Sequence, residues 1–341
     1  MKVVTFGEIM LRLKPPGFER FLQSPLLEAT FGGGEANVAV ALASLGINSS
    51  YVTAVPDNPI GQACIGELRK YGVDTSMIVK TGKRLGAYYL EQGACQRPSV
   101  VIYDREHSSV SEAPAEKYDW ELIFKDASWF HISGITPAIS ANAANVTIAA
   151  VSFAKKKGVQ VSCDLNYRGK LWKYGKKAPE VMTEIMRHVD IAVGNEEDCQ
   201  KSLGIEAKIS TDNAGFNENA YKEITDKVLS AYPDLKKIAI TLRQSNSADS
   251  NGWSAVMNNR KEYLTSIHYD IDDIVDRVGS GDSFAAGLIY GLHKYGSDKE
   301  ALDFAVAASC LKHSVPGDFP LVTEAEVLGL LKSGGSGRVQ R

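Results

Sequence analysis

The sequence lacks the features that mark several common protein classes. Its five cysteines include no C-x-x-C pair, and its histidines form no cluster at metal-ligand spacing, which argues against a zinc site or a disulfide framework. It has no basic excess, with 38 Lys and Arg against 41 Asp and Glu, whereas proteins that bind nucleic acid usually carry one. We therefore expect reduced, mostly buried thiols and no nucleic-acid partner.

Long apolar segments are missing as well. The opening MKVVTFGEIMLRL has neither the apolar core nor the small-residue cleavage site of a secretory signal. Residues 132–154 carry no formal charge, but Gly134, Pro137, Asn142 and Asn145 interrupt them. A half-buried helix that follows a loop is therefore predicted there, rather than a membrane span. The sequence accordingly predicts a cytoplasmic protein without a membrane partner.

Three common signatures of phosphate chemistry are absent too. The sequence contains no G-x-x-x-x-G-K-[ST], no G-x-G-x-x-G after a strand-like segment, and neither H-R-D nor D-F-G. These absences exclude the usual P-loop, dinucleotide-binding and protein-kinase sites. Any phosphate site in this chain must therefore be built from another motif.

What the 341 residues do contain is an alternation of strand-like and helix-like segments. Strand-like segments are VVTF from residue 3, SYVTAV from 50, WFHIS from 129, VQVSCD from 159, DIAVGN from 190 and KIAIT from 237. Helical spacing lies between most of them, for example in residues 35–46, 61–72 and 180–189. This order predicts an α/β fold in three layers, with a mostly parallel central sheet covered by helices on both faces.

Two segments break the alternation. In residues from about 9 to 31 and from 77 to 112, apolar and polar positions alternate as in strands, without an intervening helix. We therefore predict a small β-sheet inserted into a single domain of residues 1–332. Ligands of open α/β sheets bind beyond the carboxyl ends of the strands, and an inserted sheet beside that edge could close over them as a lid. The Gly- and Ser-rich residues 333–341 predict a flexible tail.

The stretch DRVGSGDSFAAG at 276–287 places three glycines and two serines around one acid, Asp282. Because Phe284, Leu288 and Leu292 recur every four positions, a helix is predicted to begin near this acid. Unpaired amides in a first helical turn attract anions, and glycines let the backbone approach them closely. Two interpretations follow from the residues alone: the turn binds phosphate, or Asp282 only caps the helix, which is the commonest role of Asp at such a position and the preferred one without further evidence.

Two motifs resemble signatures of the ribokinase-like (pfkB-type) carbohydrate kinases. DRVGSGD resembles the family's carboxy-terminal D-T-x-G-A-G-D, with Arg277 in place of the common Thr, and GGGEANVAVALASLG at 32–46 resembles its amino-terminal glycine signature. The resemblance runs from about residue 2 to about residue 332. It implies a ribokinase-like three-layer α/β/α fold with a small β-sheet lid, and transfer of a phosphoryl group from ATP, with Mg²⁺, to a sugar hydroxyl.

By this resemblance, the acid of the carboxy-terminal signature removes the proton from the hydroxyl that attacks the γ-phosphate. That residue is Asp282, and Gly279, Ser280 and Gly281 form the anion hole that stabilises the charge developing on the phosphoryl group. An ordinary Asp has a pKa of about 3.9, far below that of an alcohol. We therefore expect positioning and anion stabilisation to dominate the rate.

Within the family, GAYYLE, IYDRE, SGITPAIS, DLNYRGKLW and PGDFP resemble the subgroup of 2-keto-3-deoxygluconate kinases, which phosphorylate the terminal (C6) hydroxyl of an acidic keto sugar. The substrate contacts that this implies are Gly33, Gly34, Asn37, Tyr88, Tyr103, Arg105, Arg168 and Asp318. Arginine pairs bidentately with carboxylates, which suits an acidic substrate. Without the family, Tyr88, Tyr103 and Arg105 would be ordinary residues of the inserted sheet, whereas Arg168 follows a strand at the ligand-binding edge.

Two further stretches resemble the nucleotide side of these kinases. VGNEEDC resembles the family's N-x-x-E region, but an Asp stands where Glu is usual, so Mg²⁺ would be held through water or by the preceding acid. These acids could equally serve only to favour a helix start. ITLRQSNSADSNGWSAV takes the place of the nucleotide loop. The implied nucleotide contacts are Asn166, Asn195, Thr241 and Arg243, and the implied metal contacts are Glu197 and Asp198.

Other functions fit parts of this pattern. The same kinase chemistry could act on fructose, ribose or a nucleoside, a non-catalytic sugar-binding regulator could use the same fold, and a Rossmann oxidoreductase could share the α/β alternation. The inserted sheet would expose an apolar face if it stood alone, and members of the resembled family often pair their lids. A homo-oligomer is therefore predicted, either a dimer through the lid or a higher assembly.

Overall fold

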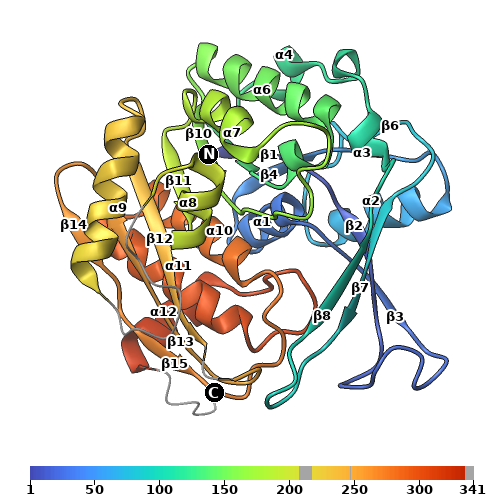
Figure 1. The fold of residues 1–341 in the computed structure, drawn as a ribbon. Coiled ribbons are helices and arrows are strands. Elements are labelled where there is room, and N and C mark those ends of the chain that lie inside the picture. The colour runs from blue at the N-terminus through green and yellow to red at the C-terminus, as the bar shows by residue number, and fades with distance from the viewer. Residues whose placement is uncertain (207–216, 246, 335–341) are drawn as a thin grey trace.

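A large, mostly parallel sheet forms the centre of the molecule (Figure 1). The computed structural model describes residues 1–206, 217–245 and 247–334, and within them the strand order is β14-β13-β12-β11-β10-β9-β1-β4, with β15 also paired to β13. These strands are β1 (Lys2–Phe6), β4 (Asn48–Val52), β9 (Trp129–Ser133), β10 (Gln160–Asp164), β11 (Ile191–Gly194), β12 (Lys237–Ser245), β13 (Asn251–Asn258), β14 (Tyr263–Thr265) and β15 (Tyr269–Ile271). Neighbours from β4 to β12 run parallel, whereas β13 pairs antiparallel.

Helices cover both faces of this sheet, which confirms the predicted α/β fold. One face carries α1 (Gly34–Ser44), α10 (Ser280–Lys294), α11 (Asp298–Lys312) and α12 (Glu324–Ser333). The other carries α3 (Ser109–Glu112), the 3₁₀ turn η1 (Ala115–Lys117), α4 (Trp120–Ile123), α5 (Thr136–Ile139), α6 (Ala141–Lys156), α7 (Ala178–Met186), α8 (Glu196–Leu203) and α9 (Glu218–Ala231). None of the described helices is long and apolar enough to cross a bilayer.

Alternation along the strands divides the core between the two faces. In β11, Ile191 and Val193 pack with α10 and α11, whereas Ala192 between them packs with the helices of the opposite face. Successive strand residues point to opposite faces, so a run that is apolar at every position is what a sheet buried on both sides requires. The helix α2 (Pro59–Lys70) and the short pair β5 (Ala54–Val55) and β6 (Val79–Lys80) complete the body beyond β4.

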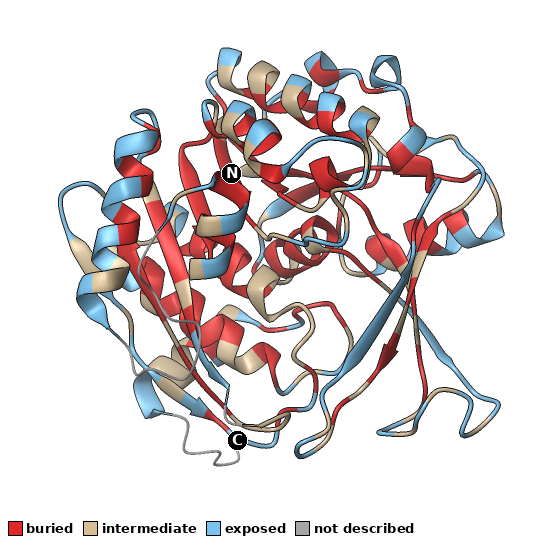
Figure 2. Cartoon of the chain, in the orientation of Figure 1, coloured by how far each residue is buried: buried red, intermediate tan, exposed pale blue. Residues whose placement is uncertain are grey.

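A second, four-stranded sheet projects from the body (Figure 1). Its order is β3 (Glu28–Gly32), β2 (Met10–Lys14), β7 (Gly86–Glu91) and β8 (Val100–Asp104). We call these four strands, with their connecting turns, the lid. They fall within the two segments singled out in the sequence, but β6 and α3 of the second segment belong to the body. Figure 2 shows the outer strands of the lid exposed.

All five cysteines are free thiols. Cys64, Cys163 and Cys199 are buried, Cys310 is half-buried and Cys95 is exposed at the end of the lid. Most of the thiols are thus buried, as expected. The predicted tail, 333–341, lies outside the described residues from residue 335 onward.

Candidate active site

The glycine turn leads into helix α10, with Asp282 in its first turn. The residue that caps this helix is Gly279, whose φ of 85° is the left-handed conformation that favours glycine. A Cβ on Gly279 would lie 2.1 Å from the carbonyl oxygen of Asp318, so a side chain is excluded there. Asp282 lies inside the helix and makes no cap hydrogen bond. Helix capping is therefore not the role of Asp282, and its side chain is left for another partner.

That partner comes from the amino-terminal glycine signature. The side-chain amide of Asn37 donates to Oδ2 of Asp282 at 2.6 Å, and its oxygen accepts from the Gly33 amide at 3.2 Å. A Cβ on Gly34 would lie 3.4 Å from Oδ1 of Asp282. Because α1 packs along α10, the two motifs meet at one carboxylate although Asn37 and Asp282 are 245 positions apart in the chain.

Burial makes Asp282 a stronger base than an ordinary aspartate. It raises the pKa of Asp282 to about 7, with further upward contributions from Asp318 and Glu35, while the Asn37 hydrogen bond and Arg168 act in the opposite direction. Removing a carboxylate from water disfavours its charged form. The sequence suggested a base with an ordinary low pKa. The structure instead places the group near neutrality, where general bases act best.

The remaining residues of the turn leave space for an anion. A Cβ added at Gly281 would meet no atom within 4 Å. The carbonyl oxygen of Ser280 points back to α11, where it accepts from the Ser309 hydroxyl at 2.7 Å. The Ser283 hydroxyl donates to Ala308 at 3.0 Å. The turn is thus anchored behind and open in front, which suits an anion hole.

Of the predicted sugar contacts, Tyr88 and Asp318 are already in contact. The Tyr88 hydroxyl donates to Oδ1 of Asp318 at 2.6 Å, and both residues are buried. Tyr103 lies beside Tyr88 on the neighbouring strand, with ring centroids 6.1 Å apart, but it is exposed. The lid therefore brings the aromatic candidates to the side of the body that carries the acids.

Arg105 forms an ion pair that the sequence did not reveal. Its Nε lies 2.7 Å from Oε2 of Glu8, and both side chains are buried. Oε1 of Glu8 has no hydrogen-bond partner among the described residues. Glu8 borders the glycine signature, because a Cβ on Gly33 would lie 2.1 Å from its carbonyl oxygen. The Arg105 cation thus lies beside the predicted sugar site with one carboxylate already bound.

Arg168 follows β10, as expected, and lies among acids. Its Nη1 donates to the Tyr167 carbonyl at 2.9 Å. Burial raises the pKa values of Asp164, Asp198 and Asp282, and the positive charge of Arg168 opposes each of these shifts. The guanidinium is therefore close enough to act on the candidate base and remains free of an ion pair with a carboxylate among the described residues.

Arg12 is the residue that sequence reasoning missed most clearly. It lies on lid strand β2 with 2% of its surface exposed, and its two terminal nitrogens contact Asp318 Oδ1 and Asp276 Oδ2 at 2.5 Å each. In MLRLK the buried positions are Met10, Arg12 and Lys14, while the leucines are half-exposed. An alternating pattern alone suggests the opposite, with the leucines inside. Arg12 joins the lid to two carboxy-terminal segments.

On the nucleotide side, Asn195 caps helix α8. Its Oδ1 accepts from the Asp198 amide at 2.8 Å, and Oδ2 of Asp198 accepts from the Asn195 amide at 2.9 Å. Oδ1 of Asp198 accepts from the Tyr167 amide at 2.7 Å. Both oxygens of Asp198 are therefore engaged, whereas Glu197 is exposed. The described part of the chain holds no group of three acidic, His or Cys residues that could bind a metal ion.

The other nucleotide candidates lie at strand ends. Thr241 is on β12, where its hydroxyl donates to Gly194 at 3.4 Å, and Arg243 is exposed two residues further along. Asn166, with φ of 30°, follows β10, and its amide donates to Oδ1 of Asp164 at 3.2 Å. Because β10, β11 and β12 run parallel, their carboxyl ends place these residues along one edge of the sheet.

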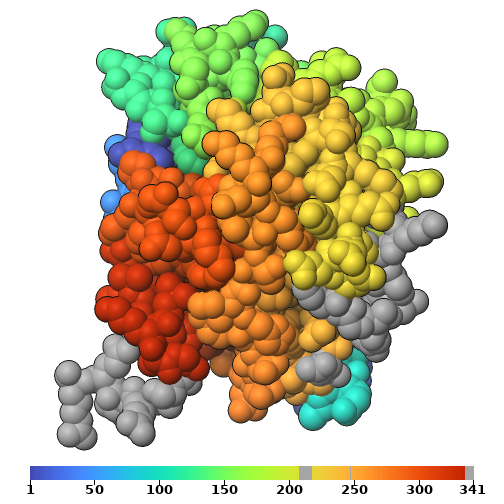
Figure 3. Space-filling model, turned by 90° about the vertical axis from the view of Figure 1, so that its left-hand side faces the viewer, coloured from blue at the N-terminus to red at the C-terminus, as the bar shows by residue number. Residues whose placement is uncertain are grey.

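Arg277, the unusual residue of the signature, contacts the hairpin between β12 and β13. Its Nη2 donates to the carbonyls of Ala248 and Ser247. The end of the lid contacts the same hairpin, where the Cys95 amide lies 2.7 Å from Asp249 Oδ2 and the Ala248 amide 2.9 Å from the Cys95 carbonyl. Figure 3 shows this lid end in cyan beside the orange hairpin. Arg277 thus ties the signature to the hairpin that meets the lid.

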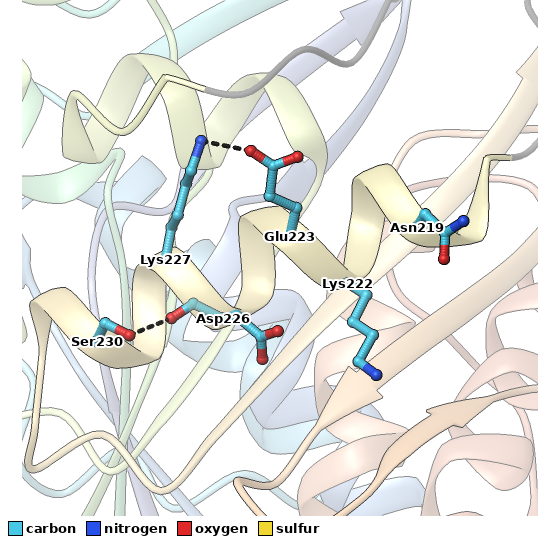
Figure 4. Close-up of a pocket in the computed structure, with 6 residues that line it drawn as sticks. All are labelled: Asn219, Lys222, Glu223, Asp226, Lys227 and Ser230. Atoms are coloured by element: carbon cyan, nitrogen blue, oxygen red, sulfur yellow. Dashed lines mark hydrogen bonds and ion pairs between the residues drawn. The ribbon is translucent and has the colours of Figure 1, made fainter.

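A cavity of about 780 Å³ opens between the lid and the carboxy-terminal segments. Arg12 and Asp276 line it, together with residues such as Phe18, Val275 and Gly317. A second hollow runs along the outer side of α9, on the sheet face opposite α10 (Figure 4). It is lined by Asn219, Lys222, Glu223, Asp226, Lys227 and Ser230, which are residues of one helix only. The first cavity adjoins the candidate site, and the second does not.

The chain is similar to several known sugar kinases. The chain is 31% identical to a 2-dehydro-3-deoxygalactonokinase of Haloferax volcanii, over 98% of both chains. It is 27% identical to a 2-dehydro-3-deoxygluconokinase of Bacillus subtilis, over 93% of this chain and 91% of that one. The solved structure of a 2-dehydro-3-deoxygluconokinase of Thermotoga maritima is 47% identical, with a TM-score of 0.92 and 98% of both chains covered.

One protein-family model matches nearly the whole chain. Residues 1–322 match the model of the family described as "pfkB family carbohydrate kinase". This match includes both glycine signatures, and it confirms the resemblance drawn from them. The two signatures meet at Asp282, as described above. The chain therefore belongs to the pfkB family of carbohydrate kinases.

Proposed function

We propose that this kinase transfers the γ-phosphoryl group of ATP to the C6 hydroxyl of 2-keto-3-deoxygluconate, giving 2-keto-3-deoxy-6-phosphogluconate and ADP. The observation that carries the proposal is the contact between Asn37 and Asp282, which joins both glycine signatures at a carboxylate with a pKa near 7. The proposed substrate is inferred from relatives named 2-dehydro-3-deoxygluconokinase. Their sugar acid, 2-dehydro-3-deoxygluconate, is the same compound as 2-keto-3-deoxygluconate.

In the proposed reaction, Asp282 accepts the proton of the C6 hydroxyl while the hydroxyl oxygen bonds to the γ-phosphorus of ATP. The bond from that phosphorus to the bridging oxygen of ATP breaks, and ADP leaves with the electron pair. Amides of the turn at Gly279–Gly281 stabilise the charge on the phosphoryl oxygens. The buried position of Asp282 raises its pKa, so it remains a competent proton acceptor at neutral pH.

The sugar acid suits the charges beside the base. Arg168 has no carboxylate partner among the described residues, and Arg105 lies beside Glu8 at the glycine signature. We propose that these cations bind the substrate carboxylate, while Tyr88, Tyr103 and Asp318 contact its hydroxyl or keto oxygens. A charged fork that pairs with a carboxylate would separate a sugar acid from a neutral sugar.

Mg²⁺ fits this site as an ion that arrives with the phosphates of ATP. Asp198 has both oxygens occupied by backbone amides, which leaves exposed Glu197 to contact the ion's water shell. Mg²⁺ commonly keeps several waters and bridges phosphate oxygens. When bound, it would neutralise charge on the phosphates, while Asn166, Asn195, Thr241 and Arg243 are the proposed contacts of the nucleotide.

Release of ADP should depend on the sugar offered. With ATP and Mg²⁺, we expect catalytic efficiency to be highest for 2-keto-3-deoxygluconate when compared with fructose, ribose and adenosine. Arg168→Met should lower kcat/KM for the sugar acid by about 10- to 100-fold, because one charge-assisted hydrogen bond is lost. Arg187→Met, an exposed arginine at the end of α7, is the control and should have no effect.

Equal efficiency on a neutral sugar would remove the proposed pairing of arginine with the carboxylate and leave the kinase chemistry. Absence of turnover on every sugar would favour a sugar-binding regulator on the same fold. The relative from Haloferax volcanii makes 2-keto-3-deoxygalactonate, the epimer at C4, the second candidate substrate. The same assay with both epimers compares the two.

We also propose that the chain forms a homodimer through the lid. Val100 and Ile102 of edge strand β8 are 44% and 51% exposed. Because residues two positions apart point to the same face, this face of the strand is apolar and exposed, and exposed edges readily pair with another strand. A second copy of the lid would cover them.

A cytoplasmic location is also a prediction, and the free thiols are consistent with it.

Sedimentation velocity at micromolar concentration should give the mass of a dimer or a larger assembly. Ile102→Lys should shift the protein to monomer, because it places a charge in the proposed interface. Ile267→Lys changes an equally apolar exposed residue, 39% exposed and outside the lid, and should leave the assembly intact. A wild-type protein that sediments only as monomer would contradict the proposal.

A further inference from the structure

Lys312, the last residue of α11, is a buried cation for which the proposed reaction has no role so far. None of its surface is exposed, and fully buried lysines are rare unless they are paired. Its ammonium donates to two main-chain carbonyls, at 2.9 Å to Val315 and 3.3 Å to Asp276. Among the described residues it forms no ion pair within 4.0 Å, because Arg12 takes the carboxylates of Asp276 and Asp318.

This ammonium lies directly behind the glycine turn. A Cβ built on Gly279 would be 3.4 Å from Cε of Lys312, so the end of the lysine side chain packs against the first glycine of the candidate anion hole. Two residues further on, a Cβ on Gly281 would meet nothing within 4 Å. The lysine thus packs against the first glycine of the turn, whereas the second glycine faces open space.

The carbonyl that Lys312 holds belongs to the first residue of the signature, and every polar group of that residue is fixed. Oδ1 of Asp276 accepts from the Val278 amide at 3.0 Å, and Oδ2 accepts from Gly317 at 3.1 Å as well as from Arg12. The Asp276 amide donates to His313 at 3.2 Å. Lys312 supplies the remaining contact, to the carbonyl oxygen.

The contact also fixes the peptide that leads into the turn. In a trans peptide the C=O and N–H groups point in opposite directions. Because the carbonyl of Asp276 points to the ammonium, the amide of Arg277, two residues before Gly279, points away from it. A cation on the carbonyl side also strengthens the positive end of the peptide dipole, and in a water-poor interior this influence is larger than in water.

Burial and the neighbouring carboxylates act on the charge of Lys312 in opposite directions. Burial lowers the pKa of Lys312, and the negative charges of Asp276, Asp318 and Asp282 oppose that shift. Asp282 is the candidate base, so the lysine and the base act on each other. The chain keeps an ammonium in a place where desolvation disfavours it, next to the groups that would face the transferred phosphoryl.

We propose that Lys312 is a positioning residue for phosphoryl transfer. It holds the turn at 276–281 in the conformation that binds the phosphoryl group, and its ammonium supplies the positive charge beside the carbonyls of Asp276 and Val315, so that no added monovalent cation is needed at these two carbonyls. Lys312 acts through the backbone of the turn and does not touch the substrate. The inference rests on the proposed function, because that function assigns the anion hole to Gly279–Gly281.

The test compares three purified variants with the wild type under the same ATP and Mg²⁺ conditions. Lys312→Met keeps the length of the side chain and removes the charge, and Lys312→Ala leaves space for an added cation. Lys294→Met is the matched control, because Lys294 ends the neighbouring helix α10 but is exposed and pairs with Glu324. We expect Lys312→Met to lower kcat about tenfold or more with the sugar KM within about twofold, and Lys294→Met to change neither.

Rescue separates positioning from simple structural support. Ammonium chloride should restore kcat of Lys312→Ala several-fold, because NH₄⁺ can occupy the space beside the two carbonyls, whereas tetramethylammonium chloride at the same ionic strength is too large to do so. Wild-type turnover should be the same in potassium and in tetramethylammonium buffers. This last measurement needs no variant, so it tests the proposal even if the Lys312 variants do not fold.

Three results would overturn the proposal: a folded Lys312→Met with wild-type kcat, a folded Lys312→Ala that ammonium does not rescue, or a wild-type enzyme that requires potassium. All three are measured on the sugar that the wild type turns over fastest, and the two variants are compared with the wild type. A preference for a neutral sugar would therefore contradict the proposed substrate and leave this test intact. Absence of wild-type turnover on any sugar would contradict the proposed function itself, and with it the role of Lys312.

Discussion

Replacing Asp282 with Asn is expected to lower kcat by about 10²- to 10⁴-fold, the usual contribution of a general base. The substitution keeps the size of the side chain, and Asn37 can still donate to the new amide oxygen in the place of Oδ2. The fold should therefore be preserved while the proton acceptor is lost. Steady-state release of ADP, together with circular dichroism, measures both effects.

The same residue should set the pH dependence of the wild type. Because burial raises the pKa of Asp282 to about 7, kcat/KM should rise about tenfold per pH unit below that value and level off above it. The residual activity of Asp282→Asn should lack this rise. A profile that is flat between pH 5 and 8 would show that Asp282 does not act as a base with this pKa.

The raised pKa of Asp282 should also make the stability of the fold depend on pH, but the free energy of unfolding should fall as pH rises, whereas kcat/KM rises. The pKa of Asp282 is higher in the folded state than in the unfolded chain, so between about pH 4 and 7 the folded state binds more protons. The contribution of this group to the free energy of unfolding is therefore lost as pH rises through about 7. Asp282→Asn has no proton to lose, so relative to the wild type it should become more stable as pH rises, by roughly 4 kcal/mol at most.

Asp270→Asn is the control for both measurements. Asp270 lies on β15, its side chain is 83% exposed, and its ion-pair partner is a histidine. It should leave kcat, the pH profile and the stability of the protein unchanged. If Asp282→Asn kept more than about a tenth of wild-type kcat, the assignment of Asp282 as the base would have to be abandoned.

Replacing Arg12 with Met is expected to destabilise the protein by about 3–5 kcal/mol. The guanidinium is 2% exposed and joins Asp276 and Asp318, both of which are also buried. Removing it leaves two carboxylates without their counter-ion in a low-dielectric interior, which costs more than the ion pairs themselves contribute. Urea unfolding at neutral pH measures the loss.

The control for Arg12 is a second arginine of the lid. Arg20→Met removes an arginine that is 68% exposed and lies 3.8 Å from Glu91, so the free energy of unfolding should change by less than about 1 kcal/mol. The double variant Arg12→Met, Asp318→Asn should recover part of the loss, because one of the stranded charges is gone. Wild-type stability in Arg12→Met would show that the two acids are neutral or find other partners.

Asn37 and Asp282 could be singled out from the sequence as candidate site residues because the two glycine signatures are defined by local spacing. A helix that begins after Gly-Ser-Gly presents its first amides and Asp282 together, whatever surrounds them. The apolar runs of β9, β10 and β11 likewise predicted a sheet buried on both faces. Short-range geometry and composition were sufficient in these cases.

Other features of the site depend on segments that are far apart in the chain. Arg12 contacts residues 264 and 306 positions away, and the pattern of its own strand gave no sign that the polar side faces inward. Glu8 and Lys312 also find their partners only once the lid and α11 are packed. The pKa of Asp282 is a further case, since it depends on burial by elements from both ends of the chain.

The sequence by itself determined the family, the α/β alternation and the choice of Asp282 as the candidate base, because motifs and periodicity act over a few residues. Only the tertiary structure decided that two signatures share one carboxylate, that burial raises its pKa toward neutrality, and that buried Arg12 and Lys312 both contact Asp276. The physical reason is that desolvation and ion pairing depend on distances in space, which packing sets and which separation along the chain does not reveal.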